Sequence, residues 1–269
     1  MNTKQESREE WLVSLLERIE QHEKDQLDSN VNDYHKLRWG SVLSGASYLP
    51  RYQGLRSFFI NNDLHGLKQN FYVVCKLLMA SEKEAEPGGD PFATYVPFLY
   101  GLLSDSTEIY DWLAHAELKE KDEVKTPHFL FHQFQLVLLR DDDALRETIA
   151  LVAKKGGNQK KAIAQAGQDF FSLLLKQDKE SLQALIENQA KIKSVDDLED
   201  QFLAAIPAVH AKLCWYRGIE VQIQNPLVPM GLMPIEPLDT YDVEYDFLRP
   251  GWTPPPPPGL FAKVKRLFL

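Results

Sequence analysis

The clearest candidate metal ligands are His128 and His132, which lie four residues apart and would share one face of a helix. Two imidazoles at that spacing can hold a zinc ion, but no third-ligand pattern accompanies them. Ordinary histidines on a helix explain the pair more simply. The sequence also lacks the glycine-rich phosphate loop, CxxC, HExxH and nucleophile-elbow motifs. We therefore expect no bound metal and no other cofactor.

Three consecutive aspartates, Asp141 to Asp143, form a cluster of carboxylates. Their position between two apolar runs explains them as the start of a helix, where one Asp caps the first turn and the others favour the positive end of the helix dipole. The same explanation fits Asp196 and Asp197. An enzyme built on a helical scaffold would need a metal or carboxylate site that the sequence does not show, so we expect no catalytic activity.

The acidic stretch 236–247 holds five carboxylates, interleaved aromatic rings and no basic residue. Carboxylates beside tyrosines suit a surface that meets a cationic partner protein, and a solvated loop is the alternative. Arg38 stands among apolar residues, either as an arginine at a helix edge or as part of a structural or partner-facing ion pair. The candidate partner-binding residues are Arg38, Asp239, Tyr241, Asp242, Glu244, Tyr245 and Asp246.

The elements that must position these residues are predicted from a pattern that recurs at Asp63, Asp105, Asp141 and Asp178. In each copy an aliphatic residue precedes the Asp by three positions, and apolar residues follow it at the fourth and eighth positions. Those offsets share one helical face, and Asp is a preferred N-cap. The copies lie roughly 40 residues apart, a period typical of stacked helical hairpins. We predict an all-α, α-solenoid-like fold of antiparallel hairpins, with each of these aspartates capping a helix.

Other signals predict where the first helices begin and end. Ser7 and the glutamate three residues later fit a capping box, so a helix should begin there. Asp28 or Ser29 is expected to cap a second helix, which runs to about Tyr48 and is closed by Pro50.

We divide the chain into a helical-hairpin array over 1–217, an extended Pro-rich segment over 218–258 that packs on the array, and a short amphipathic helix over 259–269. The last helix of the array is expected over 195–216, kinked or split by Pro207. The terminal amphipathic stretch can touch a membrane, but at about eleven residues it is marginal as a free helix, which favours docking against the protein itself.

Composition indicates an ordinary globular chain of 269 residues, with 44% hydrophobic and 26% charged residues. The net charge of −9 argues against nucleic acid and favours a basic protein partner. Cys75 and Cys214 lie in apolar runs and are expected to be reduced and buried. The charged N-terminus does not fit a signal peptide, and no run reaches the ~20 apolar residues of a membrane span. We expect a cytoplasmic location and no stable membrane insertion.

An acidic all-α chain of this size, with an early helix carrying His-Lys-Leu-Arg-Trp at 35–39, resembles the Immunity protein 49 family of bacterial polymorphic toxin systems. The repeated units of apolar helix, Asp, small residue and Leu add to the likeness, as does the Pro-rich ending. The resemblance covers roughly 31–247 and would match Arg38 to the family's characteristic arginine; the proline run and the basic end lie outside it.

The resemblance implies an antitoxin that neutralises a cognate toxin by direct protein–protein contact. The alternative function is a helical-repeat adaptor or chaperone, which would bind a peptide or an effector protein in its concave face.

Overall fold

The computed structural model describes residues 7–84, 90–191 and 201–256. Over these residues the chain forms helices and connections without a β-strand, which confirms the predicted all-α fold of helical hairpins. The first elements are α1 (Arg8–Asn32), η1 (Tyr34–Lys36), α2 (Trp39–Ala46), α3 (Tyr48–Phe59), α4 (Leu64–Lys83), η2 (Pro91–Ala93), α5 (Val96–Ser104) and α6 (Thr107–His115). The later ones are α7 (Pro127–Leu139), α8 (Asp142–Lys155), α9 (Asn158–Gln165), α10 (Phe170–Lys176), α11 (Lys179–Ala190), α12 (Ala205–Tyr216), η4 (Met230–Leu232) and η5 (Asp246–Leu248).

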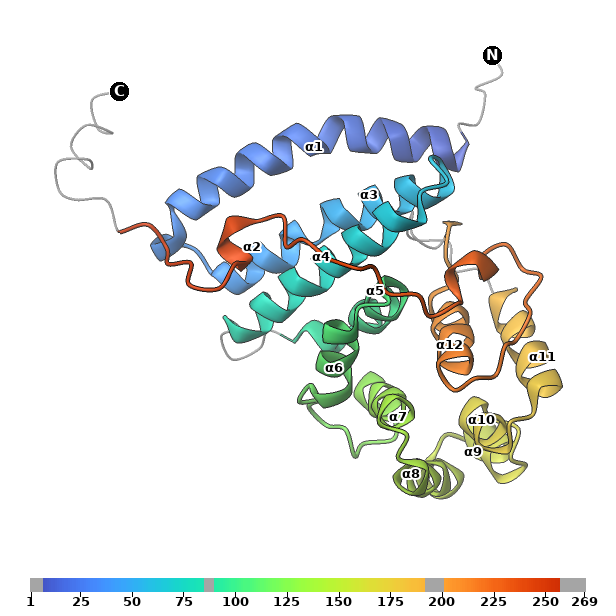
Figure 1. The fold of residues 1–269 in the computed structure, drawn as a ribbon. Helices are drawn as coiled ribbons and strands as arrows, with labels where there is room; N and C mark the ends of the chain where they lie inside the picture. The colour runs from blue at the N-terminus through green and yellow to red at the C-terminus, as the bar shows by residue number, and fades with distance from the viewer. Residues whose placement is uncertain (1–6, 85–89, 192–200, 257–269) are drawn as a thin grey trace, which may run out of the picture.

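The N-terminal helices pack together, with α1 along α3 and with α4 against both α2 and α3 (Figure 1). The predicted capping box begins α1. The Glu10 backbone N–H donates to the Ser7 hydroxyl at 3.2 Å, and the Ser7 N–H donates to the Glu10 carboxylate at 2.9 Å. This reciprocal pair satisfies two of the donors that a helix N-terminus otherwise leaves unpaired.

The length of α1 corrects one predicted boundary. The helix continues through Asp28 and Ser29, where the sequence predicts a cap, and ends at Asn32. Both side chains are exposed to water and Leu27 is buried, so the helix keeps its apolar face and the polar groups do not compete with its backbone. Pro50 does not end a helix either, because it lies in the first turn of α3, where the N–H that it lacks has no helical partner.

Three of the four repeated aspartates cap a helix as predicted. Asp63, Asp141 and Asp178 each accept a hydrogen bond from the backbone N–H three residues later, at the starts of α4, α8 and α11. The donor–acceptor distances are 2.9, 3.0 and 3.1 Å. The apolar residues four positions after these caps are fully buried: Leu67, Leu145 and Leu182.

The fourth copy departs from the pattern. Ser106, not Asp105, caps α6 by accepting from the Ile109 N–H, so the predicted cap is wrong by one residue. Asp105 instead follows the last residue of α5 in a left-handed conformation, with φ of 57°. Its carboxylate is buried and is paired with two lysines.

The later hairpins curve round until the array closes on itself. Each helix from α5 to α8 contacts the next, α10 contacts α8 and α11, and α12 packs against α11, α5 and α7 (Figure 1). Buried aromatic side chains of α7, α10 and α12 meet on the inner side. The His210 ring of α12 stacks on Phe170 of α10 at 3.8 Å and lies 5.8 Å from Phe134 of α7.

The last helix is shorter than predicted. α12 begins at Ala205, whereas the sequence predicts a helix over 195–216, and part of that range lies outside the described residues. Phe202 and Leu203 precede α12 in a non-helical link and are buried. Pro207 therefore falls in the first turn of α12, where it neither kinks nor splits the helix.

Residues 219–256 run from α12 over α5 and α4 toward α2, the orange-to-red trace in Figure 1. Apart from η4 and η5 the segment is not helical, and several of its apolar side chains join the core: Val221, Ile223, Val228, Leu232 and Met233. The predicted amphipathic helix 259–269 lies outside the described residues. Among the helices that the structure describes, none is both long and apolar enough to cross a membrane.

Candidate functional site

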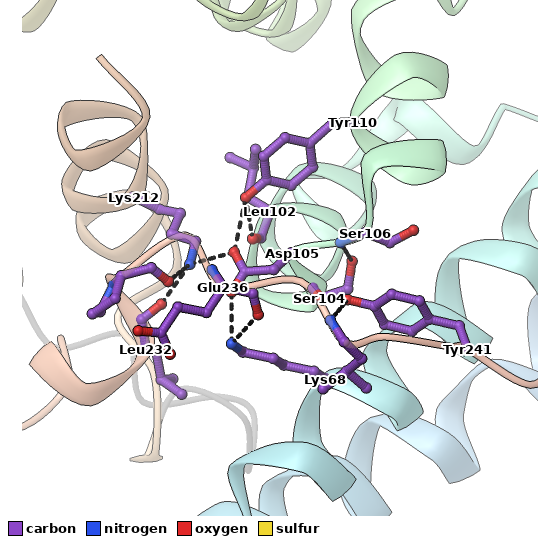
Figure 2. A network of polar contacts seen from close by, with 12 residues as sticks. Lys68, Leu102, Ser104, Asp105, Ser106, Tyr110, Lys212, Leu232, Glu236 and Tyr241 are labelled. Carbon is purple, nitrogen blue, oxygen red and sulfur yellow. Dashed lines mark hydrogen bonds and ion pairs between the residues drawn. The ribbon is translucent and has the colours of Figure 1, made fainter. Parts of the chain in front are cut away.

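A buried aspartate between two buried lysines lies where the C-terminal segment crosses the helices (Figure 2). The Lys68 ammonium, from α4, lies 2.9 Å from one carboxylate oxygen of Asp105. The Lys212 ammonium, from α12, lies 2.6 Å from the other. The exposed fractions are 3% for Lys68, 1% for Asp105 and 0% for Lys212. Charges this deeply buried persist only when they are paired and hydrogen-bonded.

The same charges hold the C-terminal segment through its backbone. Lys68 donates to the carbonyl of Glu236 at 2.6 Å, and the Glu236 N–H donates to the Asp105 carboxylate at 3.2 Å. Lys212 donates to the carbonyls of Leu232 and Pro234 at 2.7 and 2.9 Å. One aspartate therefore connects α4, the α5–α6 turn, α12 and the segment.

Burial also changes the titration of the network. It lowers the pKa of Lys212 to about 8, although the Asp105 carboxylate opposes that shift. Burial and the same carboxylate raise the pKa of Tyr110 well above its usual value. The Tyr110 hydroxyl donates to the Leu102 carbonyl at 2.8 Å and contacts Asp105 at 3.1 Å. Because the three charged groups are closed to solvent, the network positions the segment and offers no substrate access.

Sequence reasoning missed this network, although two signals were present. Lys212 interrupts an apolar run, and Lys68 adjoins the apolar stripe of α4 that begins at Leu67. A lysine with apolar residues on every side of a helix must either snorkel to water or find a buried anion. Two adjacent residues can each cap a helix at 105–106, so Ser106 can serve as the cap while Asp105 serves as the buried anion.

Tyr241, one of the predicted partner-binding residues, is used inside the molecule. Its hydroxyl donates to the Ser104 carbonyl at 2.7 Å and accepts from the Leu238 N–H at 3.0 Å. Its ring packs on Tyr72 of α4, with centroids 4.8 Å apart. Burial raises the pKa of Tyr241 above its usual value. This tyrosine anchors the acidic segment to its own helices.

The other aromatic residues of the segment act in the same way. Tyr245 stacks on Phe247 with centroids 5.2 Å apart, and Phe247 lies edge-on to Trp39 of α2 at 5.5 Å. Trp252 follows at 6.2 Å from Phe247. Tyr245, which the sequence predicts as a partner contact, thus packs within the molecule, and the contact of Phe247 with α2 fixes the segment in place.

The carboxylates of the segment, in contrast, are exposed: Asp239, Asp242, Glu244 and Asp246. Arg249, just beyond the predicted stretch, lies 3.2 Å from both Asp242 and Asp246. Such exposed ion pairs contribute little to stability. Partial burial raises the pKa of Glu244, and the charge of Asp242 adds to that shift. The structure therefore presents a fixed row of carboxylates in which negative charge exceeds positive charge.

Arg38 lies at the same end of the molecule as η5. It is exposed and precedes α2 as its N-cap residue, and the adjacent Trp39 contacts Phe247. The structure thus brings Arg38 near the end of the acidic segment, whereas the sequence separates the two by most of the chain.

The candidate metal ligands are arranged differently. His128 Nε2 lies 2.8 Å from the Asp90 carboxylate, and His132 has a buried Nδ1 without a hydrogen-bond partner. Within the described residues no three His, Cys, Asp or Glu side chains form a group that can hold a metal ion. Cys75 and Cys214 are fully buried free thiols, as predicted.

Comparisons of this chain with known proteins find no relative. No protein-family model matches the chain, and searches of curated proteins and of solved structures find no significant match. The resemblance to the Immunity protein 49 family therefore stays a prediction from the residues alone.

Proposed function

We propose that this chain is a non-catalytic binding protein that neutralises a cognate bacterial toxin by direct contact, with the acidic segment in or beside the contact. One observation carries the proposal. The carboxylates of Asp239, Asp242, Glu244 and Asp246 face solvent on a segment whose backbone and rings are held by the helices beneath it.

A charged segment that is already ordered suits binding. Ordering a free segment on association costs conformational entropy, and that cost is lower when the bound shape exists beforehand. The backbone of Asp242 is tied to the side chain of Gln69 through two hydrogen bonds, of 2.6 and 3.1 Å. The net charge of −9 would also speed the encounter with a cationic toxin.

The two other classes of function find less support. A peptide-binding adaptor or chaperone needs an open concave face, but the inner side of the array is occupied by side chains of α7, α10 and α12, including Phe134, Phe170 and His210. An enzyme needs reachable reactive groups, and the charged cluster at Asp105 is buried.

The functional test is co-expression of this chain with the toxin domain encoded beside its gene, scored by growth. We expect the chain to restore growth and to bind the purified toxin domain in a one-to-one titration. Toxicity that is unchanged by co-expression would contradict the proposed function.

The surface is tested with a folded variant that carries Asp239→Lys, Asp242→Lys, Glu244→Lys and Asp246→Lys. If the residues lie at the rim of the contact, association should slow and its salt dependence weaken; if they are buried there, dissociation should speed up. The control carries four charge reversals to Lys at exposed carboxylates elsewhere: Glu117, Asp122, Glu123 and Glu147. Equal binding by both variants at low and moderate salt would remove the segment from the interface.

A further inference from the structure

A groove lies between α1 and the end of the acidic segment. Its volume is about 650 Å³, and its lining comes from α1, α2, α3 and residues 244–252. Apolar side chains contribute to it, among them Leu27, Leu49 and Trp252. Five carboxylates also line the groove, against the single ammonium of Lys24: Glu20, Glu23, Asp28, Glu244 and Asp246.

The segment side of the groove keeps an excess of negative charge, because the single guanidinium of Arg249 lies 3.2 Å from both Asp242 and Asp246 and can offset only one of these charges. Glu244 is partly removed from water and lies near the charge of Asp242, and both effects raise its pKa, while Lys24 opposes them only in part. On the other side, Glu20 already contacts Arg56 at 3.1 Å. A cationic, partly apolar occupant would match both the excess charge and the apolar lining.

The chain itself contains a sequence with that chemistry. Residues 259–269 read Gly-Leu-Phe-Ala-Lys-Val-Lys-Arg-Leu-Phe-Leu, with three basic side chains, no acidic ones, and aliphatic and aromatic residues between them. The described chain leads to the groove, because Trp252 lines it. Shortly after, the carbonyl of Pro255 lies 2.8 Å from His35 Nε2, in the connection that follows α1.

Residues 257–269 are long enough to reach along the groove. Thirteen residues, 257–269, reach up to about 40 Å when extended. The 25 residues of α1 are about 37 Å long. A short tether also gives an effective concentration on the order of millimolar. A sequence with a Kd of about 100 μM would then have a ratio of bound to free states of about 10.

We infer that the groove is the docking site for this chain's own residues 259–269, whose Lys263, Lys265 and Arg266 are attracted by its carboxylates. Docking there covers the Glu244 and Asp246 end of the acidic segment. A cationic partner that needs those two carboxylates must then displace the basic residues. The inference does not depend on the proposed function, because it concerns only this chain.

The test uses the full chain with a nitroxide spin label on Leu269→Cys, since Cys75 and Cys214 are fully buried and are not expected to react. We expect broadening of the amide signals of Leu27 and Ala46, beside the groove. The broadening should be lost when Lys263→Glu, Lys265→Glu and Arg266→Glu are added. The charge-preserving control Lys263→Arg, Lys265→Arg and Arg266→Lys should retain it.

Three outcomes would overturn the inference. The first is broadening away from the groove, or broadening that survives charge reversal. The second is broadening only in a mixture of labelled and unlabelled chains, which assigns the occupant to a second copy. The third is a groove that stays unbroadened while residues 259–269 bind vesicles containing phosphatidylserine and the Lys/Arg→Glu variant does not, which assigns the sequence to a lipid surface.

Discussion

At the scale of single residues, Lys212 combines full burial with a charged side chain. It is fully buried in α12, yet its ammonium contacts Asp105 and two backbone carbonyls. Burial lowers its pKa from 10.5 to about 8 despite that carboxylate. The folded chain therefore releases this proton at a lower pH than the unfolded chain does.

This difference predicts how stability depends on pH. Between pH 8 and 10.5 the unfolded chain binds more of this proton than the folded one, so Lys212 makes the free energy of unfolding rise with pH in that window. In Lys212→Met the contribution is absent. From pH 8 to 10.5 we expect the free energy of unfolding of the wild type to rise by up to roughly 3 kcal/mol more than that of the variant. Urea unfolding at a series of pH values measures the free energy of unfolding of both proteins. The same pH dependence in wild type and variant would refute the lowered pKa of Lys212.

At the scale of elements, the hairpins depend on local signals. The caps at Asp63, Asp141 and Asp178 and the buried leucines that follow them are set within a few residues of sequence. Leu145 and Ile186 are fully buried on α8 and α11. Truncation of either should leave a cavity that the neighbouring helices fill only in part.

Leu145→Ala and Ile186→Ala should therefore each lower the free energy of unfolding by about 2–5 kcal/mol. Leu139→Ala is the matched control, because Leu139 is 45% exposed and should cost much less. Chemical denaturation of the three variants measures the differences. Losses near zero at the two buried positions would contradict the close packing of Leu145 and Ile186.

Local signals explain why most of the hairpins could be predicted and why the Asp105 network could not. Ser7, Asp141 and Asp178 act on backbone groups three residues away, so the pattern contains both partners. Asp105 has the same local pattern, but its two lysines come from α4 and α12. Periodicity carries no information about which distant helices meet. The roles of the aromatic residues in the acidic segment escaped prediction for the same reason.

At the scale of the whole molecule, the last helix of the array packs against earlier helices, and the carboxylate of Asp105 lies at that contact. α12 returns to α5 and α7, and the segment crosses from α12 to α2. Asp105 joins the helices and the segment at that crossing. Loss of its charge should therefore weaken the whole fold, not one hairpin.

Asp105→Asn keeps the shape of the side chain but leaves two buried ammonium groups without their anion. Removal of one partner from a buried pair typically costs about 3–5 kcal/mol. We expect a loss of that size, in one transition seen equally by circular dichroism and by tryptophan fluorescence. The same change at a helix cap, Asp178→Asn, should cost little, because Asn caps helices as well as Asp. Equal stability of the two variants would contradict the role of Asp105.

The return of α12 to the earlier hairpins has a consequence for synthesis on the ribosome. α5, α7 and α10 are made before α12, and residues of their inner faces, such as Phe134 and Phe170, pack on a helix that has not yet been translated. Translation proceeds at roughly 5–20 residues per second, so these rings are without their final partner for several seconds. During that interval the nascent chain exposes an apolar surface. A translational pause before α12 would lengthen the time in which this surface can aggregate or bind chaperones.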